Sequence, residues 1–311
     1  MATVRKDVAP GWRLVDWTVA VSRRLPMKQL GSSVKYIMLV PAVILVTILA
    51  VGLIDLLWLS IHSFDAFRNK QGPVSLEQYR RLFIGQSASF YRGVLLRTLT
   101  LSVLVTIGSV CLALPVSYFI VHIRRRSWRF IVLNLLLVPF LMGEIVRAFG
   151  WLLLLGQNGA VSWLLGLAGI HEFKLVGTWV AIWPGMIQVM MPISALVMLP
   201  AIRRIGSDLE GAAETLGARP WRIWWHIVIP LARPGIVAAA AVSFTLSMTE
   251  FAIPQVLGLG RLPFVANAIS NIYFLQNNIY LGSAFAMVLV VVVTIVVVLL
   301  VRVGRGWSVE S

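Results

Sequence analysis

The sequence predicts an all-α polytopic membrane protein with about six transmembrane helices. Of its 311 residues, 59% are hydrophobic and 13% are charged, and the mean hydropathy is +0.88. A soluble domain is closer to half apolar and a quarter charged. The apolar residues form runs of about 20 or more, long enough for a helix to cross roughly 30 Å of hydrocarbon. Only helices and closed barrels satisfy their backbone groups in lipid, and the runs lack the alternation of a barrel strand.

Six apolar segments account for the predicted spans. They cover approximately residues 36–63, 94–122, 130–155, 176–199, 234–257 and 283–301. The fourth is interrupted by Pro184 and Pro192, which a span tolerates when neighbouring helices satisfy the freed carbonyls. We therefore expect the fourth span inside the bundle. The last span is uniformly apolar over residues 288–300, so we expect it to face lipid.

Two connections between spans contain surface helices. In residues 64–93, Ser75 is expected to begin a helix, and Gln78 completes a capping box three residues later. The residues that follow have apolar side chains at helical spacing. These are Leu76, Tyr79, Leu82 and Phe83. Residues 157–178 contain a similar stripe, formed by Trp163, Leu164 and Leu167.

The distribution of Lys and Arg predicts the orientation. If the N-terminus is cytoplasmic, that side carries 18 basic residues and the other side seven, so both termini are expected in the cytoplasm. The chain then divides into a basic cytoplasmic segment (1–35), a transmembrane domain (36–303) and a cytoplasmic tail (304–311). Residues 1–35 lack an apolar core, so the first span acts as an uncleaved signal.

The net charge of +15 does not indicate nucleic-acid binding. The basic residues lie in short segments beside the apolar runs, which is the pattern that sets membrane topology. The single cysteine, Cys111, lies within an apolar run, so no disulfide framework is expected.

The connection between the fourth and fifth spans, at about 206–232, is the most informative segment. Ser207 or Asp208 is expected to cap a helix, with further acids in its first turns. Gly217 ends that helix and Pro220 opens a second, aromatic-rich helix that stops at Pro230. The sequence thus predicts a compact knob that docks into a partner's groove.

The residues of this connection resemble the "EAA" loop of bacterial ABC-importer permeases. The resemblance rests on Ala212 and Ala213, Gly217 five positions after the first of them, and Ile227-x-Ile229-Pro230. Flanking residues, among them 138–140 and 155–159, are similar to the branch that includes spermidine/putrescine permeases. The similarity covers about residues 36–300 and implies the type I ABC-importer permease fold.

In that family the loop forms a coupling helix that inserts into a cleft of the ATP-binding subunit. The positions that the resemblance assigns to ATPase coupling are Glu210, Gly211, Ala212, Ala213, Gly217, Ile227, Ile229 and Pro230. One position departs from the pattern, because the family's leading glutamate aligns with Gly211 while Glu210 stands one residue earlier. Adjacent helical residues point about 100° apart, so the departure puts the usual glutamate contact in doubt.

The resemblance also implies partners and a location. They are a second permease subunit, giving a heterodimer, two ATP-binding subunits and an extracytoplasmic solute-binding protein, all in or at the lipid bilayer of the bacterial cytoplasmic (inner) membrane. The sequence contains no G-x-x-x-x-G-K-[ST] motif, so this chain is not expected to be an enzyme. ATP and Mg would bind to the partner ATPase. The four histidines lack ligand spacing, so no cofactor or metal is expected here.

Charged residues within the predicted spans are candidates for a substrate pathway, because each costs about 2.5–3.5 kcal/mol to insert. They are Asp55, Glu144, Arg147 and Glu250. Carboxylates lining a cavity would suit a cationic solute such as a polyamine. Alternatively, Glu144 and Arg147, three residues apart, neutralise each other. Glu250 has no such neighbour in sequence and precedes Pro254, where the helix is expected to break.

A second hypothesis is an autonomous secondary transporter driven by protons or Na⁺, with Glu144 or Glu250 as the ion relay. Such proteins contain paired, interrupted repeats. The sequence contains no convincing repeat, and the segment around Gly217 would be unexplained. A membrane enzyme is a more distant alternative. Co-purification with an ATPase would separate the first two hypotheses.

Overall fold

The computed structural model describes residues 33–65, 70–167, 169 and 174–306. The chain divides into two compact parts, residues 1–55 and 56–311, which are described separately. Most of the predicted N-terminal segment, and residues 307–311 of the predicted tail, lie outside the described residues. Six helical stretches are long and apolar enough to cross a membrane, which agrees with the predicted number of spans.

The first part consists of most of α2 (Ser33–Ser60), the first candidate span. From Leu39 to Asp55 every residue is exposed. A helix that is apolar on all sides is stable only against lipid or other protein.

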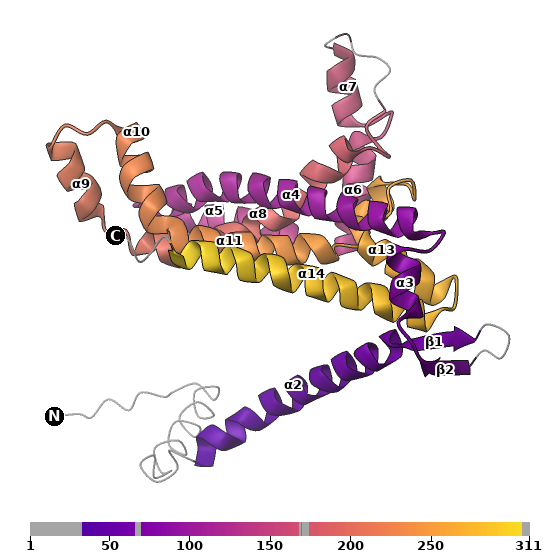
Figure 1. The fold of residues 1–311 in the computed structure, drawn as a ribbon. Helices are drawn as coiled ribbons and strands as arrows, with labels where there is room; N and C mark the ends of the chain where they lie inside the picture. Colours follow the sequence, from indigo (N-terminus) through magenta and orange to yellow (C-terminus); the bar gives the residue numbers. More distant parts are fainter. Residues whose placement is uncertain (1–32, 66–69, 168, 170–173, 307–311) are drawn as a thin grey trace, which may run out of the picture. The chain divides into compact units, whose positions relative to one another are not determined.

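The second part is built on four long helices that lie side by side (Figure 1). They are α4 (Ala88–His122), α8 (Trp179–Arg203), α11 (Ile229–Thr249) and α14 (Ile279–Gly306). Helix α8 packs against both α4 and α11, and 61% of its most apolar window is buried. This confirms that the fourth span lies inside the bundle. Helix α8 continues through Pro184, Pro192 and Pro200, so the span tolerates its prolines as expected.

Small and hydroxyl side chains hold these helices close together, as is common between membrane helices. A Cβ atom added to Gly235 of α11 would lie 2.5 Å from the Cβ of Ala201 on α8. The Ser117 hydroxyl of α4 donates to the Ala195 carbonyl of α8 (2.9 Å). The hydroxyl groups of Ser194 and Ser243 join α8 to α11.

The third and fifth predicted spans are each broken. The expected helix at 130–155 is instead α5 (Arg126–Leu141) and α6 (Glu144–Leu155), because Met142 and Gly143 have extended backbone. The long apolar stretch that could cross a membrane here is 144–167, which also includes α7 (Ala160–Leu167). Helix α11 ends at Thr249 and α12 (Ala252–Leu257) follows. This break therefore lies at Glu250 and Phe251 rather than at Pro254.

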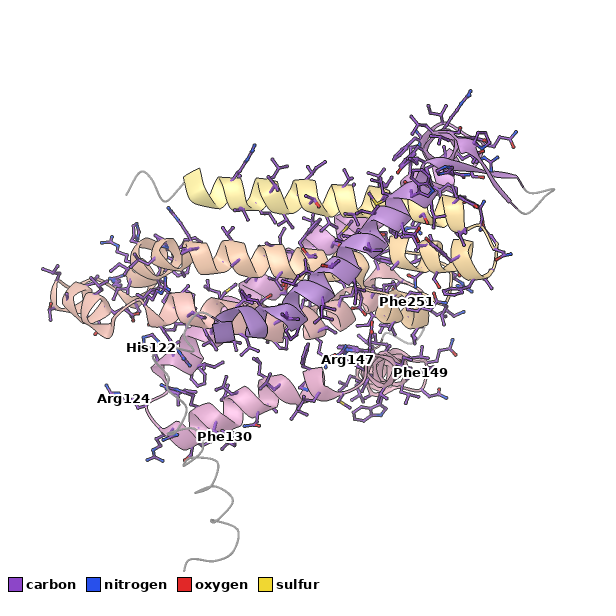
Figure 2. The ribbon with its side chains drawn as sticks, turned by 90° about the horizontal axis from the view of Figure 1, so that it is seen from below. His122, Arg124, Phe130, Arg147, Phe149 and Phe251 are labelled. Carbon is purple, nitrogen blue, oxygen red and sulfur yellow. The ribbon has the colours of Figure 1, made fainter. Side chains whose placement is uncertain are left out.

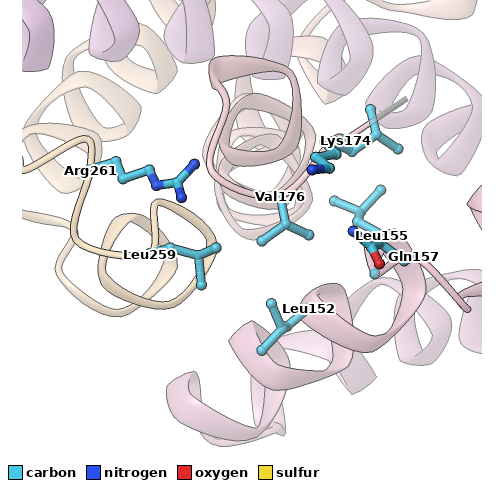
Figure 3. Close-up of a pocket in the computed structure, with 9 residues that line it drawn as sticks. Leu152, Leu155, Gln157, Lys174, Val176, Leu259 and Arg261 are labelled. Carbon is cyan, nitrogen blue, oxygen red and sulfur yellow. The ribbon is translucent and has the colours of Figure 1, made fainter. Parts of the chain in front are cut away.

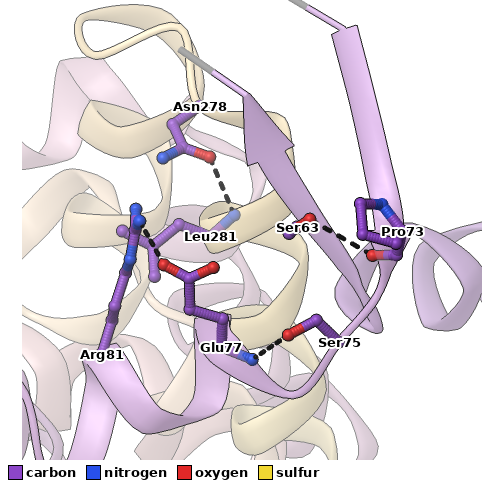
Figure 4. Close-up of polar contacts among 7 residues, drawn as sticks. All are labelled: Ser63, Pro73, Ser75, Glu77, Arg81, Asn278 and Leu281. Atoms are coloured by element: carbon purple, nitrogen blue, oxygen red, sulfur yellow. Dashed lines mark hydrogen bonds and ion pairs between the residues drawn. The ribbon is translucent and has the colours of Figure 1, made fainter.

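One end of the second part carries a small hairpin of β1 (His62–Asp65) and β2 (Lys70–Val74), followed by α3 (Glu77–Phe83). The predicted capping box is wrong, because α3 begins at Glu77 and Gln78 is therefore only its second residue. The Ser75 hydroxyl instead accepts the Glu77 N–H at 3.1 Å, and Arg81 pairs with the Glu77 carboxylate (Figure 4).

Two further helices complete this end. Helix α13 (Val265–Phe274) packs against α4 and α14. Helix α7 exposes Trp163, Leu164 and Leu167. Its position as a surface helix stays a prediction, because α7 also belongs to the candidate span 144–167.

The opposite end carries α9 (Ser207–Thr215) and α10 (Pro220–Ile223), and it is called the α9–α10 end below (Figure 1). Gly206, rather than Ser207 or Asp208, is the N-cap of α9, with no side-chain cap. The predicted stop at Pro230 is wrong. A short π-helix over Trp224–Val228 leads from α10 directly into α11, whose first turn tolerates the missing N–H of Pro230.

Candidate functional site

Two predicted acids, Glu144 and Glu250, stand at the two helix breaks. Glu144 is the first residue of α6, and Glu250 lies directly after α11. One Glu250 carboxylate oxygen, Oε1, accepts the backbone N–H of Ile253 at the start of α12 (3.4 Å). The partial positive charge of a helix N-terminus favours a carboxylate at both places.

The packing of α6 against α12 brings these two acids together. The Glu250 side chain lies within electrostatic reach of both the Glu144 carboxyl group and the Arg147 guanidinium. Glu250 is 8% exposed, whereas Glu144 is exposed. Residues more than 100 positions apart thus form one charged cluster, which we call the Glu144–Arg147–Glu250 cluster.

Arg147 holds the break between α5 and α6. Its Nη1 donates to the carbonyl oxygen of Pro139 at 3.0 Å, a group left without a helical partner at the end of α5. Among the described residues no ion pair joins Glu144 to Arg147, so the alternative of a self-neutralising pair is not what the structure contains. Figure 2 labels Arg147 close to Phe149 in the region of α6, with Phe251 nearby.

Two amide side chains near the cluster were not among the predicted site residues. The Asn267 amide donates to Gln255 Oε1 (2.9 Å) and to the Phe251 carbonyl (3.0 Å), which fixes the backbone just after Glu250. The Gln188 side chain accepts the Trp151 indole N–H (2.7 Å) and so ties α6 to α8. Their sequence signal is a polar amide within an apolar run.

A cavity of about 400 Å³ lies beyond the cluster, between α6, the segment before α8 and the loop after α12. Its lining residues are Leu152, Leu155, Gly156, Gln157, Lys174, Leu175, Val176, Leu259 and Arg261. Figure 3 shows Lys174 and Arg261 on either side of Val176. These two cations would repel an ammonium group, so this cavity does not suit a cationic solute.

The remaining predicted acid, Asp55, is an exposed residue of α2 in the first part of the chain. Its assignment to a substrate pathway stays a prediction.

At the α9–α10 end, Gly217 has φ +80°, the left-handed backbone predicted for the turn after α9. No heavy atom lies within 4 Å of a Cβ added there, so the requirement for glycine comes from the backbone alone. The N–H groups of Gly217 and Ala218 close the turn onto the carbonyls of Glu214 and Ala213.

The two alanines of the loop face different surroundings. Ala213 packs against the hydrophobic core cluster that includes Ile223 and Val228, whereas Ala212 is exposed. Leu209 and Leu216 are 52% and 89% exposed and share a helix face with Ala212, at spacings of three and four residues. We call Leu209, Ala212 and Leu216 the exposed α9 face. Sequence reasoning missed this face because two large apolar side chains in a short helix first indicate a core.

The other predicted coupling positions lie nearer the bundle. Ile227, Ile229 and Pro230 are half-buried, and Ile227 packs against the same core as Ala213. Gly211 is half-buried with open space around its Cα. Glu210 points inward, and its carboxylate accepts the Tyr118 hydroxyl of α4.

Comparison with known proteins gives a family match and similar chains. Residues 17–306 match the family described as "Binding-protein-dependent transport system inner membrane component". The chain is 28% identical to the inner membrane ABC transporter permease protein YdcU of Escherichia coli (strain K12), over 81% of this chain and 84% of that one. It is 26% identical to the spermidine/putrescine transport system permease protein PotB of Haemophilus influenzae, over 69% and 74% of the two chains.

A solved structure has a similar fold. In the crystal structure of a bacterial alginate ABC transporter in complex with alginate pentasaccharide-bound periplasmic protein, one chain superposes with a TM-score of 0.72. The match covers 90% of this chain and 97% of that one at 18% identity.

Proposed function

This chain belongs to the family of binding-protein-dependent transport system inner membrane components and has the type I ABC-importer permease fold, and from that premise we propose that it forms the translocation path for a small cationic solute. It is a multi-pass inner-membrane permease subunit of an ABC importer. Its relatives are permeases rather than enzymes, and the ATPase of such importers is a separate subunit. The family match over residues 17–306 carries this conclusion.

The solute that best fits the chain is a polyamine. Two carboxyl groups and one guanidinium lie near one another at the helix breaks, so the acidic groups outnumber the basic one. A protonated amine would be attracted strongly there, since charges interact far more strongly where water is scarce. The similarity to PotB supports the same solute class.

The proposed complex pairs this chain with a second, different permease subunit, two ATP-binding subunits and a solute-binding protein. In this arrangement the α9–α10 end faces the cytoplasm together with both termini, and the exposed α9 face docks into the ATP-binding subunit. Closing of the ATPases on ATP would push α9 and so reshape the path between the helices.

Uptake by the reconstituted complex tests the solute class. Vesicles containing this chain with its partner permease, ATPases and binding protein are offered labelled putrescine or spermidine, with a neutral sugar and an anionic sugar acid of similar size as controls. We expect ATP-dependent uptake of the polyamine alone. Uptake of the anionic solute in preference to the polyamine would overturn the assignment of a cationic substrate.

A further inference from the structure

The Glu210 carboxylate joins α9 to the end of α4. Its Oε2 atom accepts the Tyr118 hydroxyl at 2.5 Å and lies 3.4 Å from His122 Nε2. The side chain of Glu210 is only 12% exposed, and its other oxygen, Oε1, is buried without a hydrogen-bond partner among the described residues. The whole carboxylate therefore depends on these two donors from α4.

Ring contacts among Tyr118, His122 and Trp224 hold the two donors in place. The rings of Tyr118 and His122 stack with centroids 4.0 Å apart, and the Trp224 ring lies 4.9 Å from Tyr118. These side chains come from α4 and from the π-helix that precedes α11, so α4, α9 and the start of α11 meet at one point. Figure 2 labels His122 at this end of α4.

The contacts of the His122 ring determine when it can donate a hydrogen bond to Glu210. Its Nδ1 lies 2.9 Å from the Tyr118 carbonyl oxygen. A carbonyl only accepts hydrogen bonds, so Nδ1 carries a proton, and Nε2 carries another only when the ring is cationic. The titratable groups around this point are Tyr118, His122, Glu210 and Glu214. The guanidinium of Arg129 on α5 is also close, since it donates to the Val121 and Ile123 carbonyls on either side of His122.

Without this contact α9 would be weakly oriented. The helix is bounded by Gly206 and Gly217, the residue type with the greatest backbone freedom. Glu210 is one residue from Leu209, the nearest member of the exposed α9 face, and so points about 100° away from it. A partner bound to the exposed face would leave the contact between Glu210 and α4 intact.

We propose that Glu210 is a positioning residue that fixes the angle of α9 against α4 through Tyr118, with His122 strengthening the link when its ring is protonated. A displacement of the exposed α9 face by the ATPase then also displaces α4, instead of only changing the backbone angles at Gly206 and Gly217. This inference rests on the proposed function, because it assigns how the movement of an ATPase enters the permease. It also separates Glu210 from the direct ATPase contact that the family resemblance implies.

The test uses the assembled complex in vesicles and measures solute moved per ATP hydrolysed. Tyr118→Phe keeps the stacked ring and Glu210→Gln keeps the side-chain shape. Tyr118→Phe should lower this ratio by about tenfold, the effect expected for losing a hydrogen bond to a charged group. Glu210→Gln keeps a side-chain oxygen that can accept from Tyr118 and removes only the charge, so it should lower the ratio by less. The double variant should match Tyr118→Phe, because both changes act on one interaction. The matched control is Tyr79→Phe, which removes a tyrosine hydroxyl that donates to Ser60 at the hairpin end of the protein and should leave the ratio unchanged.

A comparison of two pH values adds a reading that a merely structural role would not give, because the His122 contact with Glu210 is charged only when both ring nitrogens carry a proton. The ratio should be higher where the ring is cationic than where it is neutral, and His122→Gln should remove that difference. Release of the ATPase by Glu210→Gln, with Tyr118→Phe silent, would overturn the proposal and make Glu210 an ATPase contact. Additive effects of the two variants would also overturn it. A wild-type complex without ATP-driven uptake would instead contradict the proposed function itself.

Discussion

Glu144 and Glu250 meet because each follows a break in a helix that otherwise has the length of a span. At each break backbone groups lose their helical partners, and nearby side chains replace them. Glu250 accepts the Ile253 N–H, and Arg147 donates to the Pro139 carbonyl. The charged side chains therefore stabilise the breaks as well as forming the site. We expect some substitutions to lower transport and others to lower the stability of the protein.

Neutralising the acids should lower transport without unfolding the protein. For Glu250→Gln and Glu144→Gln, polyamine uptake per assembled complex should fall by about tenfold or more, because each removes a charge-assisted contact with the solute. Basal ATP hydrolysis should change little. Glu144→Gln does not strand Arg147, whose partner is the Pro139 carbonyl. Uptake undiminished in both variants would remove the cluster from the pathway.

Arg147→Met should instead destabilise the protein. It leaves the Pro139 carbonyl unpaired at the break, and an unsatisfied buried polar group costs about 1–3 kcal/mol. Thermal unfolding in detergent measures the loss, with Arg92→Met at an exposed position of α4 as the control. Equal melting temperatures for the two variants would show that the break does not depend on Arg147.

Gly217→Val should strain the turn after α9. A left-handed backbone costs a non-glycine residue about 1–2 kcal/mol, and the open space around Gly217 adds no steric clash. Uptake per ATP should fall, while Gly217→Asn, which tolerates this backbone, should retain most of it. If valine and asparagine behave alike, the backbone of the turn is not what matters.

At the level of elements, the sequence predicted the number of spans and the interior position of α8 because these follow from long runs of apolar residues. It did not predict where α5/α6 and α11/α12 break. The prolines in α8 leave that helix intact, whereas the break at Met142 and Gly143 has only one weak helix former to mark it. Such breaks depend on the side chains and carbonyls that neighbouring helices supply.

The site was predictable to a similar degree. The charge of Glu144, Arg147 and Glu250 within apolar runs identified all three, but their meeting depends on the packing of α6 against α12. In α9, spacing identified the helix and Gly217, but not which face turns inward. Ala213 packs on a core cluster whose members include Ile223 and Val228, and these residues follow α9 in the sequence.

The exposed α9 face makes a prediction about docking. Leu216→Asp should weaken the association with the ATP-binding subunit by about 1.5–3 kcal/mol, the value of burying a leucine side chain. Ala213→Trp should instead overpack the permease core and destabilise it by about 1–3 kcal/mol. Pull-down of the ATPase and thermal unfolding of the permease separate the two effects. Loss of docking in a stable Ala213→Trp variant would place the partner on the other face.

For the whole molecule, we propose that a separate ATPase drives the movement of this chain. The described residues provide six candidate spans, a charged cluster at two helix breaks and, at the α9–α10 end, a short helix with an exposed apolar face. An autonomous secondary transporter would need the ion relay but would have no use for the exposed α9 face.

The energy source for uptake, measured in vesicles containing the purified complex, tests most directly whether a separate ATPase drives transport. We expect polyamine uptake that requires ATP on the side of the ATPase, requires the binding protein on the other side, and persists when ionophores collapse proton and Na⁺ gradients. The same vesicles without the ATPase should take up nothing. Uptake by the permease alone that follows an imposed proton or Na⁺ gradient and stops with the ionophore would contradict the account.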